Sequence, residues 1–159
     1  MDKEILIDPI DFIKALNKES VKYLLIGRQA LVQYGAPLQS FDYDFYISPD
    51  KGDLQKVLKI VSSFNMEIEP LHPEKSGKLT LFSANLKIDI FRARKYVISK
   101  KIILFFEEMY SRRQIFKKGD FYVQVPDLLD LKKTKLIRQS PKDKEDLKYI
   151  EILLKKSMI

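Results

Sequence analysis

Residues 21–47 read VKYLLIGRQALVQYGAPLQSFDYDFYI, and they carry the clearest structural pattern in the chain. The apolar run at 21–26 is typical of a buried β-strand. Gly27 ends that run, residues 29–34 suggest a short helix closed by Gly35, and a turn follows at 36–37. Residues 41–47 then alternate, so a second strand is expected there.

The second predicted strand carries two acids, Asp42 and Asp44, that fall on one face because side chains alternate along a strand. Their Cβ atoms would lie roughly 6–7 Å apart, so both carboxylates can hold one divalent cation or bridge two. Two like charges at this spacing cost free energy unless a cation neutralises them. On an exposed edge strand the pair would be harmless, so this motif alone leaves both interpretations open.

A third acid, Asp89, lies in the alternating segment LKIDIF at 86–91, between apolar neighbours. An Asp in such a position is unusual unless it faces an ion, a cation or solvent. Three carboxylates converging from two strands suit the two-metal arrangement for phosphoryl or nucleotidyl transfer. We expect Asp42 and Asp44 to hold the nucleotide-bound metal, and Asp89 to complete a second metal and help deprotonate the attacking hydroxyl.

These elements together resemble the nucleotidyltransferase superfamily, the polymerase β-like fold in its minimal form. The matching elements are YLLIG ending at Gly27, the helix to Tyr34, DYD at Asp42 to Asp44, and IDIF with Asp89. The resemblance implies metal-dependent transfer of a nucleoside monophosphate from an NTP to an acceptor hydroxyl, with Mg2+ or Mn2+ as cofactor.

The C-terminal stretch LLDLKKTKLIRQSPKDKEDLKYI at 128–150 resembles the closing helices of minimal bacterial members, including abortive-infection toxins of the AbiEii type. The matched pairs are Lys135-Leu136, Lys142-Asp143 and Asp146-Leu147. This resemblance implies a toxin-like role on an RNA or protein acceptor, with an antitoxin as a possible partner. Lys135 is a candidate phosphate ligand, although an amphipathic helix also presents ordinary surface lysines.

Three further positions are expected to bind substrate. Gly27 ends the first strand, but Arg28 stands where the family has Gly or Ser. An arginine there can bind phosphate through its guanidinium or fill the triphosphate position. Ser40 keeps a hydroxyl before Asp42, whereas Leu38 replaces an Arg that related sequences often carry. The alternative to an enzyme is therefore a degenerate module that binds nucleotide, RNA or a protein partner without turnover.

The rest of the chain predicts an α/β (α+β) fold, a mixed β-sheet flanked by helices and closed by C-terminal helices. Asp8-Pro9 begins a helix, and another starts near Asp50. The other predicted elements are strands at 66–69, 78–83 and 86–91, a helix at 102–110, a hairpin of 114–116 with 121–125, and helices at 127–138 and 142–155.

Composition indicates one domain, residues 1–159, and a cytoplasmic protein with no membrane segment. No apolar run approaches the about 18 residues that span a bilayer, and the N-terminus lacks a signal-peptide core. With no cysteine and a single histidine, His72, any metal must be held by carboxylates, which suits hard cations. The net charge of +7 falls entirely on residues 95–159, whereas 1–94 hold the acidic site. This distribution suggests a polyanion such as NTP or RNA as partner, and a solvated, lysine-rich surface is the alternative explanation.

Other enzyme classes fit poorly. Phosphatases of the haloacid dehalogenase type need Thr two residues after the second Asp, and Asp44 is followed by Phe45 and Tyr46. Glycosyltransferases with Asp-x-Asp normally have a longer domain. No GxGxxG or GxxxxGK motif is present, and a Ser-His-Asp triad would need His72, which lies in a Pro-flanked loop.

Overall fold

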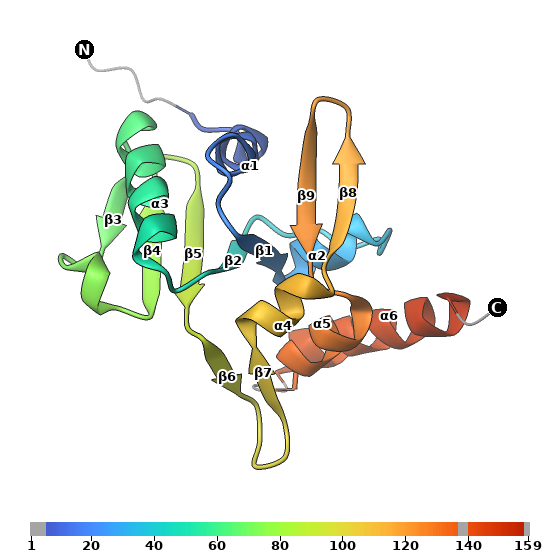
Figure 1. Ribbon diagram of the computed structural model, residues 1–159. Helices are drawn as coiled ribbons and strands as arrows, with labels where there is room; N and C mark the ends of the chain where they lie inside the picture. Colours follow the sequence, from blue (N-terminus) through green and yellow to red (C-terminus); the bar gives the residue numbers. More distant parts are fainter. Residues whose placement is uncertain (1–5, 137–139, 158–159) are drawn as a thin grey trace.

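The computed structural model describes residues 6–136 and 140–157. Its centre is a five-stranded mixed sheet (Figure 1). In spatial order the strands are β1 (Tyr23–Ile26), β2 (Tyr43–Ile47), β5 (Lys87–Arg92), β4 (Lys78–Phe82) and β3 (Glu67–Glu69). β2 and β5 are parallel, and the other neighbours are antiparallel. The predicted mixed α/β architecture is therefore confirmed.

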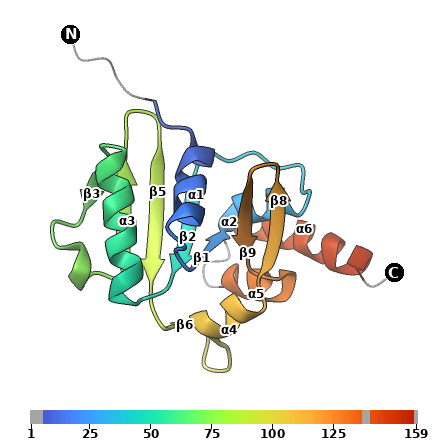
Figure 2. The ribbon, with the colours of Figure 1, turned by 45° about the horizontal axis from the view of Figure 1, so that its top comes forward.

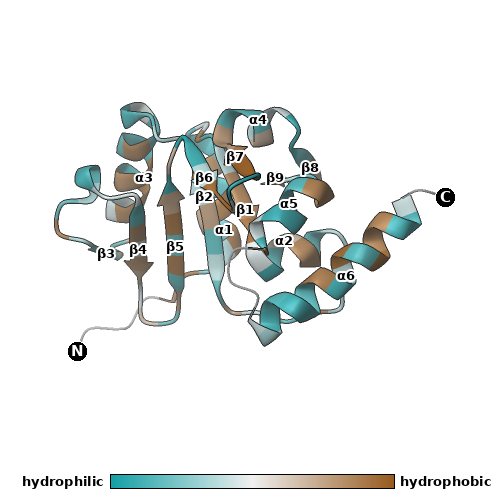
Figure 3. Cartoon of the chain, turned by 90° about the horizontal axis from the view of Figure 1, so that it is seen from below, coloured by the Kyte–Doolittle hydropathy of each residue, from teal (hydrophilic) through white to brown (hydrophobic). Residues whose placement is uncertain are grey.

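Two helices cover one face of the sheet, α1 (Pro9–Lys18) and α3 (Lys51–Ser63), which lie side by side in front of it in Figure 2. Three further helices lie near β1, as Figure 3 shows from another side. They are α2 (Gly27–Gln33), which contacts β1, α6 (Pro141–Ser157), which contacts α2, and α5 (Leu128–Thr134), which contacts α6. The remaining elements are a 3-10 turn (Pro73–Lys75), the hairpin of β6 (Lys95–Val97) and β7 (Ile103–Phe105), α4 (Phe106–Ser111), and the hairpin of β8 (Gln114–Lys118) and β9 (Phe121–Val125).

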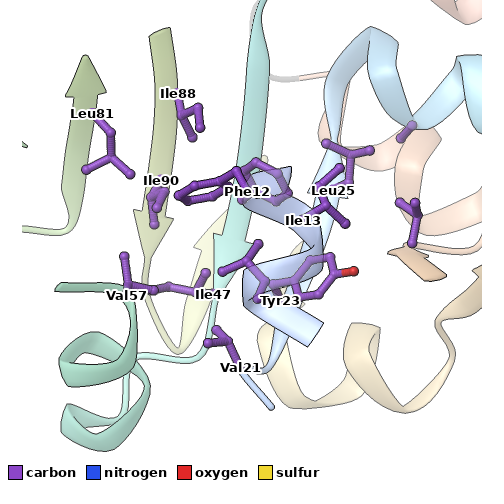
Figure 4. Packing of buried hydrophobic residues seen from close by; sticks show 14 of the residues in the cluster. Phe12, Ile13, Val21, Tyr23, Leu25, Ile47, Val57, Leu81, Ile88 and Ile90 are labelled. Carbon is purple, nitrogen blue, oxygen red and sulfur yellow. The ribbon is translucent and has the colours of Figure 1, made fainter. Parts of the chain in front are cut away.

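The α1 helix forms where the sequence predicts it. The Asp8 carboxylate caps it by accepting a hydrogen bond from the backbone N–H of Ile10, and Pro9 occupies the first turn, where no intrahelical N–H bond is lost. Phe12, Ile13 and Leu16 are buried on one stripe of the helix. Figure 4 shows Phe12 and Ile13 lying over the sheet among side chains of β1, β2 and β5.

Strand alternation gives the sheet two different faces. Ile47, Ile88 and Ile90 point to the α1 and α3 side and are fully or almost fully buried (Figure 4). Phe45 is fully buried on the same side, with its ring 5.9 Å from that of Phe12 on α1. Burial of each such side chain contributes about 1.5–3 kcal/mol. The intervening positions of β2 and β5 face the other way, and Asp44 is among them. The apolar face thus fixes the direction in which the acids point.

Two sequence predictions need correction. The helix expected at 102–110 begins only at Phe106, because Ile103–Phe105 pair with β6 as a strand. Leu104 is buried while Ile103 and Phe105 are each 43% exposed, as expected for alternating side chains of a strand. Because all three residues are apolar, the sequence does not show this alternation. The strand expected at 41–47 begins at Tyr43, and Phe41 is 91% exposed.

The predicted C-terminal helices are both present with shifted ends. The first ends at Thr134, before the predicted Arg138, which lies outside the described residues. The second runs as α6. No helix in the described ranges combines the length and apolar character needed to cross a membrane.

Candidate active site

Asp44 of β2 and Asp89 of β5 are direct partners in the parallel register of the two strands. Neighbouring strands lie roughly 4.8 Å apart, so the two half-buried acids occupy adjacent places on one face of the sheet. On the next strand, Thr80 is the register partner of Asp89, and its hydroxyl donates a hydrogen bond of 2.8 Å to Asp89 Oδ1. The structure therefore brings two of the three predicted acids together.

Asp42 lies one residue before β2, and its side chain is 68% exposed. Lys142 Nζ of α6 is 3.9 Å from Asp42 Oδ2. Ser40 binds the backbone of the same residue, because its hydroxyl accepts a 3.2 Å hydrogen bond from the Asp42 N–H. The Ser40 carbonyl in turn accepts from the side-chain amide of the buried Gln29 on α2. Ser40 thus shapes the turn that leads into the acidic strand.

The backbone of Gly27 lies close to the carboxylate of Asp44 on β2. Its φ is +72°, a left-handed conformation that other residues rarely adopt. A Cβ at this position would lie 3.3 Å from Asp44 Oδ2. The glycine therefore serves two needs, the sharp change from β1 into α2 and the close approach of the backbone to the Asp44 carboxylate.

The pKa of Asp44 is raised above its ordinary value, first by burial and then by the negative charges of Asp89 and Asp42. Lys135 and Lys142 oppose this rise. Without a further cation, the charged form of Asp44 is therefore destabilised. A divalent cation bound between the acids would relieve that cost.

A pocket of about 230 Å³ opens beside Asp44. Gly27 follows Ile26, the register partner of Asp44, so its backbone lies at the polar end of the pocket. Tyr46 lies two residues further along β2, at the aromatic end. Tyr46 and Tyr96 stack there with ring centroids 4.1 Å apart and planes inclined by 7°, and Phe91 meets Tyr46 edge-on at 6.0 Å. The complete lining is Ile26, Gly27, Asp44, Tyr46, Phe91, Tyr96, Thr134, Lys135 and Asp143.

Lys135 lines the pocket, as expected of a phosphate ligand, but its ammonium group is already bound by carboxylates. Lys135 Nζ lies 2.7 Å from Asp146 Oδ2 and 3.9 Å from Asp143 Oδ1. Arg28 binds the other oxygen of Asp146 at 2.9 Å and Glu145 at 3.2 Å. Asp146 is fully buried between these two cations. Arg28 therefore points to α6 and is outside the lining of the pocket.

Asp143 and Asp146 are two acids near the pocket that were not predicted as site residues from the sequence. Their spacing of three residues places both on one side of α6 and is the signal that could have identified them. Tyr46 and Tyr96 were also missed, and for Tyr96 no local pattern pointed to the pocket.

The residues fit a metal only in part. Within residues 6–136 and 140–157, no group of three or more His, Cys, Asp or Glu side chains is arranged as a ready-made metal site. Mg2+ commonly uses one or two carboxylates together with substrate phosphates and water, rather than a complete protein cage. Asp44 and Asp89 match that donor set, so the site suits a metal that binds jointly with a nucleotide.

Comparison with solved structures identifies the architecture. The lincosamide antibiotic adenylyltransferase LnuA, solved with lincomycin bound, superposes with a TM-score of 0.64 and 15% identity over 95% of this chain and 99% of that one. The chain has the nucleotidyltransferase fold. A Thermotoga maritima protein described as a nucleotidyltransferase gives 0.61 and 15% identity over 88% of each chain. The antibiotic-resistance factor ANT(2'')-Ia gives 0.57 and 9% identity over 91% of this chain and 86% of that one.

Sequence comparison adds nothing to this, because no protein-family model matches the chain and no curated protein is significantly similar to it. The fold implied by the resemblance to nucleotidyltransferases is confirmed. The narrower resemblance to AbiEii-type toxins stays a prediction.

Proposed function

We propose that this protein is a metal-dependent nucleotidyltransferase that moves a nucleoside monophosphate from an NTP to an acceptor hydroxyl. The observation that supports this best is the pairing of Asp44 with Asp89, because Asp44 lines a pocket together with Gly27 and Lys135. Carboxylates, a close-approaching backbone and a cation are the groups that nucleotidyl transfer requires.

Each residue has a role in this proposal. Asp44 and Asp89 would hold Mg2+ or Mn2+ together with the phosphates, and Asp42 approaches from the turn before β2. When bound, such a cation would supply positive charge against the charge that develops on the phosphates. The acceptor oxygen attacks the α-phosphorus, the bond to the β-phosphate breaks, and pyrophosphate leaves. Asp89, oriented by the Thr80 hydroxyl, accepts the proton of the acceptor.

The polar end of the pocket is where we place the triphosphate. Gly27 has no side chain to block the approach of the phosphates. Lys135 contributes a positive charge when its ammonium group binds a phosphate oxygen in addition to Asp146. The aromatic end, with Tyr46, Phe91 and Tyr96, would take a ring of the nucleotide or of the acceptor. RNA and protein hydroxyls are the acceptors we propose, in a toxin-like setting with an antitoxin partner.

A second candidate function is nucleotide or RNA binding without turnover. The arrangement of Arg28 favours it, because Arg28 replaces a small residue at the strand end and is bound to Asp146 and Glu145. Lys135 is bound to the same buried Asp146, so the cations near the pocket already have partners. A protein with this network retains a nucleotide pocket but has fewer free charges for the transition state.

Incubation with each α-labelled NTP and Mg2+ or Mn2+ tests the proposal, with bulk RNA, the protein itself and lincomycin as acceptors. Lincomycin is included because LnuA was solved with it bound. Label transfer that disappears in Asp44→Asn, but persists in Asp120→Asn on the exposed β8–β9 turn, would support the enzyme. NTP binding without transfer would support the binding module. No binding of any NTP or of RNA with either metal would refute both.

A further inference from the structure

A second pocket, of about 350 Å³, lies between α4 and the β8–β9 hairpin, near the start of β1. Gly27 and Asp44 lie at the opposite end of β1, so the two pockets are separate. Figure 1 shows the hairpin beside β1 with α4 at its base. The lining consists of Ser20, Val21, Tyr110, Arg113, Ile115, Lys117, Tyr122 and Gln124. It contains two cations and no carboxylate.

The guanidinium of Arg113 is held in one orientation. Its Nε donates a 2.6 Å hydrogen bond to Gln124 Oε1, and its Nη1 donates a 3.0 Å bond to the Tyr110 carbonyl. The guanidinium carbon also lies 4.0 Å from the centroid of the Tyr110 ring. Three interactions on two elements thus position a charge that would otherwise be free to rotate.

The group that anchors Arg113 is itself part of the core. Gln124 is 4% exposed, and its Nε2 donates to the Tyr23 carbonyl at 3.4 Å. Its backbone N–H donates to the Tyr23 hydroxyl at 3.3 Å. Tyr23 is fully buried under α1. The cation therefore stands on a rigid base, which lowers the entropy lost when it binds a ligand.

The positive charge of Arg113 is not neutralised by a carboxylate of the described part of the chain, unlike that of Arg112. Arg112 binds the carboxylate of Asp130 at 2.9 Å, whereas Arg113 forms no ion pair with any residue in 6–136 or 140–157. A guanidinium has five N–H donors, and the two hydrogen bonds above use two of them. Lys117 is exposed and is likewise outside the ion pairs of the described chain. On α4, Glu107 pairs with Lys22 instead.

We propose that this pocket is a second binding site, which takes a phosphate group of a nucleotide or of a nucleic acid strand. An arginine with donors to spare matches phosphate oxygens, and a nearby lysine adds charge. The Tyr122 hydroxyl of the lining offers a further donor, whereas the Tyr110 hydroxyl already donates to Gln124 Oε1 at 3.4 Å. Both cations of the site belong to residues 95–159, the part of the chain that carries the excess positive charge. It stands independently of the acidic site.

The two sources of phosphate are separated by two probes, a 5′-fluorescein-labelled single-stranded 12-mer RNA and AMP. Both are titrated in EDTA, so that no metal supports binding at Asp44. Anisotropy reports the RNA, and NMR chemical shifts report AMP. Lys117→Ala is the main variant because the side chain is exposed. Lys118→Ala is its matched control, since Lys118 has the same charge but lies over the Phe116 ring, outside the lining.

For the probe that binds, we expect Lys117→Ala to weaken affinity about threefold or more and Arg113→Lys about tenfold or more. For RNA, Lys117→Ala should also lower the salt slope by about 0.7, the value for one phosphate contact on a single strand. Lys118→Ala should leave both quantities unchanged. Dependence of RNA alone on Lys117 would assign a strand, and dependence of AMP would assign a nucleotide.

Equal losses in Lys117→Ala and Lys118→Ala would overturn the site, because they indicate a diffuse basic surface. Binding that is lost in Lys135→Gln but not in Lys117→Ala would also overturn it, since the ligand would then lie in the other pocket. So would the absence of binding by either probe to the wild-type protein. Unchanged melting temperatures in Lys117→Ala and Lys118→Ala keep these outcomes separate from unfolding.

Discussion

Asp146→Ala tests the buried network that attaches α6 to the rest of the fold. The carboxylate of Asp146 is fully buried and binds Arg28 Nε at 2.9 Å and Lys135 Nζ at 2.7 Å. Those two side chains are only 15% and 11% exposed. Removing Asp146 therefore leaves two cations largely desolvated, and their remaining ion-pair partners in residues 6–136 and 140–157 are Glu145 for Arg28 and Asp143 for Lys135.

Breaking a buried ion pair by removing one partner costs about 3–5 kcal/mol. A domain of this size has a free energy of unfolding of about 5–15 kcal/mol. Asp146→Ala should therefore remove a large fraction of that stability. At about 2–4 °C for each kcal/mol in a chain of this length, the melting temperature should fall by roughly 6–20 °C.

Urea denaturation and thermal melting at pH 7 measure this loss, with Glu145→Ala as the matched control. Glu145 also binds Arg28, at 3.2 Å, but its side chain is 52% exposed, and an exposed pair contributes about 0–1 kcal/mol. Asp146→Asn should fall between the two, because the amide keeps one acceptor but loses the charge. Equal losses in Asp146→Ala and Glu145→Ala would refute the argument that burial sets the cost.

Three further perturbations test the acidic site. Asp44→Asn should raise the melting temperature in metal-free buffer, since it removes a buried charge near two other acids. The same variant should abolish any stabilisation by Mg2+ with NTP. The control Asp120→Asn should show neither effect. Because folding raises the pKa of Asp44, the native state holds its proton more tightly than the unfolded chain does. The free energy of unfolding of the metal-free protein should therefore fall as pH rises from the ordinary Asp value through the raised one, and urea melts of Asp44→Asn should show a smaller fall. Gly27→Ala should destabilise by about 1–2 kcal/mol and weaken NTP binding, because of its φ of +72° and the nearby Asp44 carboxylate. Gly52→Ala, in α3 with no atom within 4 Å of the added Cβ, should instead be neutral or stabilising in the same melts.

Local patterns determined much of this protein. The apolar run before Gly27 predicts β1, and Asp8-Pro9 predicts the start of α1 because a cap and a proline act within one turn. Alternation in residues 86–91 separates Asp89 from the apolar face, since the side-chain period of a strand is two. These signals need only neighbours in sequence, so the sequence alone carries them.

Tertiary structure decided which of these elements meet. Nothing local sets Asp44 opposite Asp89; the parallel pairing of β2 with β5 does so, across α3 and the strands between them. Nor does the residue type of Arg28 indicate its partner, which is Asp146, 118 positions later. The residues at 103–105 likewise became a strand because β6 supplied a partner. Such contacts depend on the free energy of packing distant segments together, which no local pattern of residues contains.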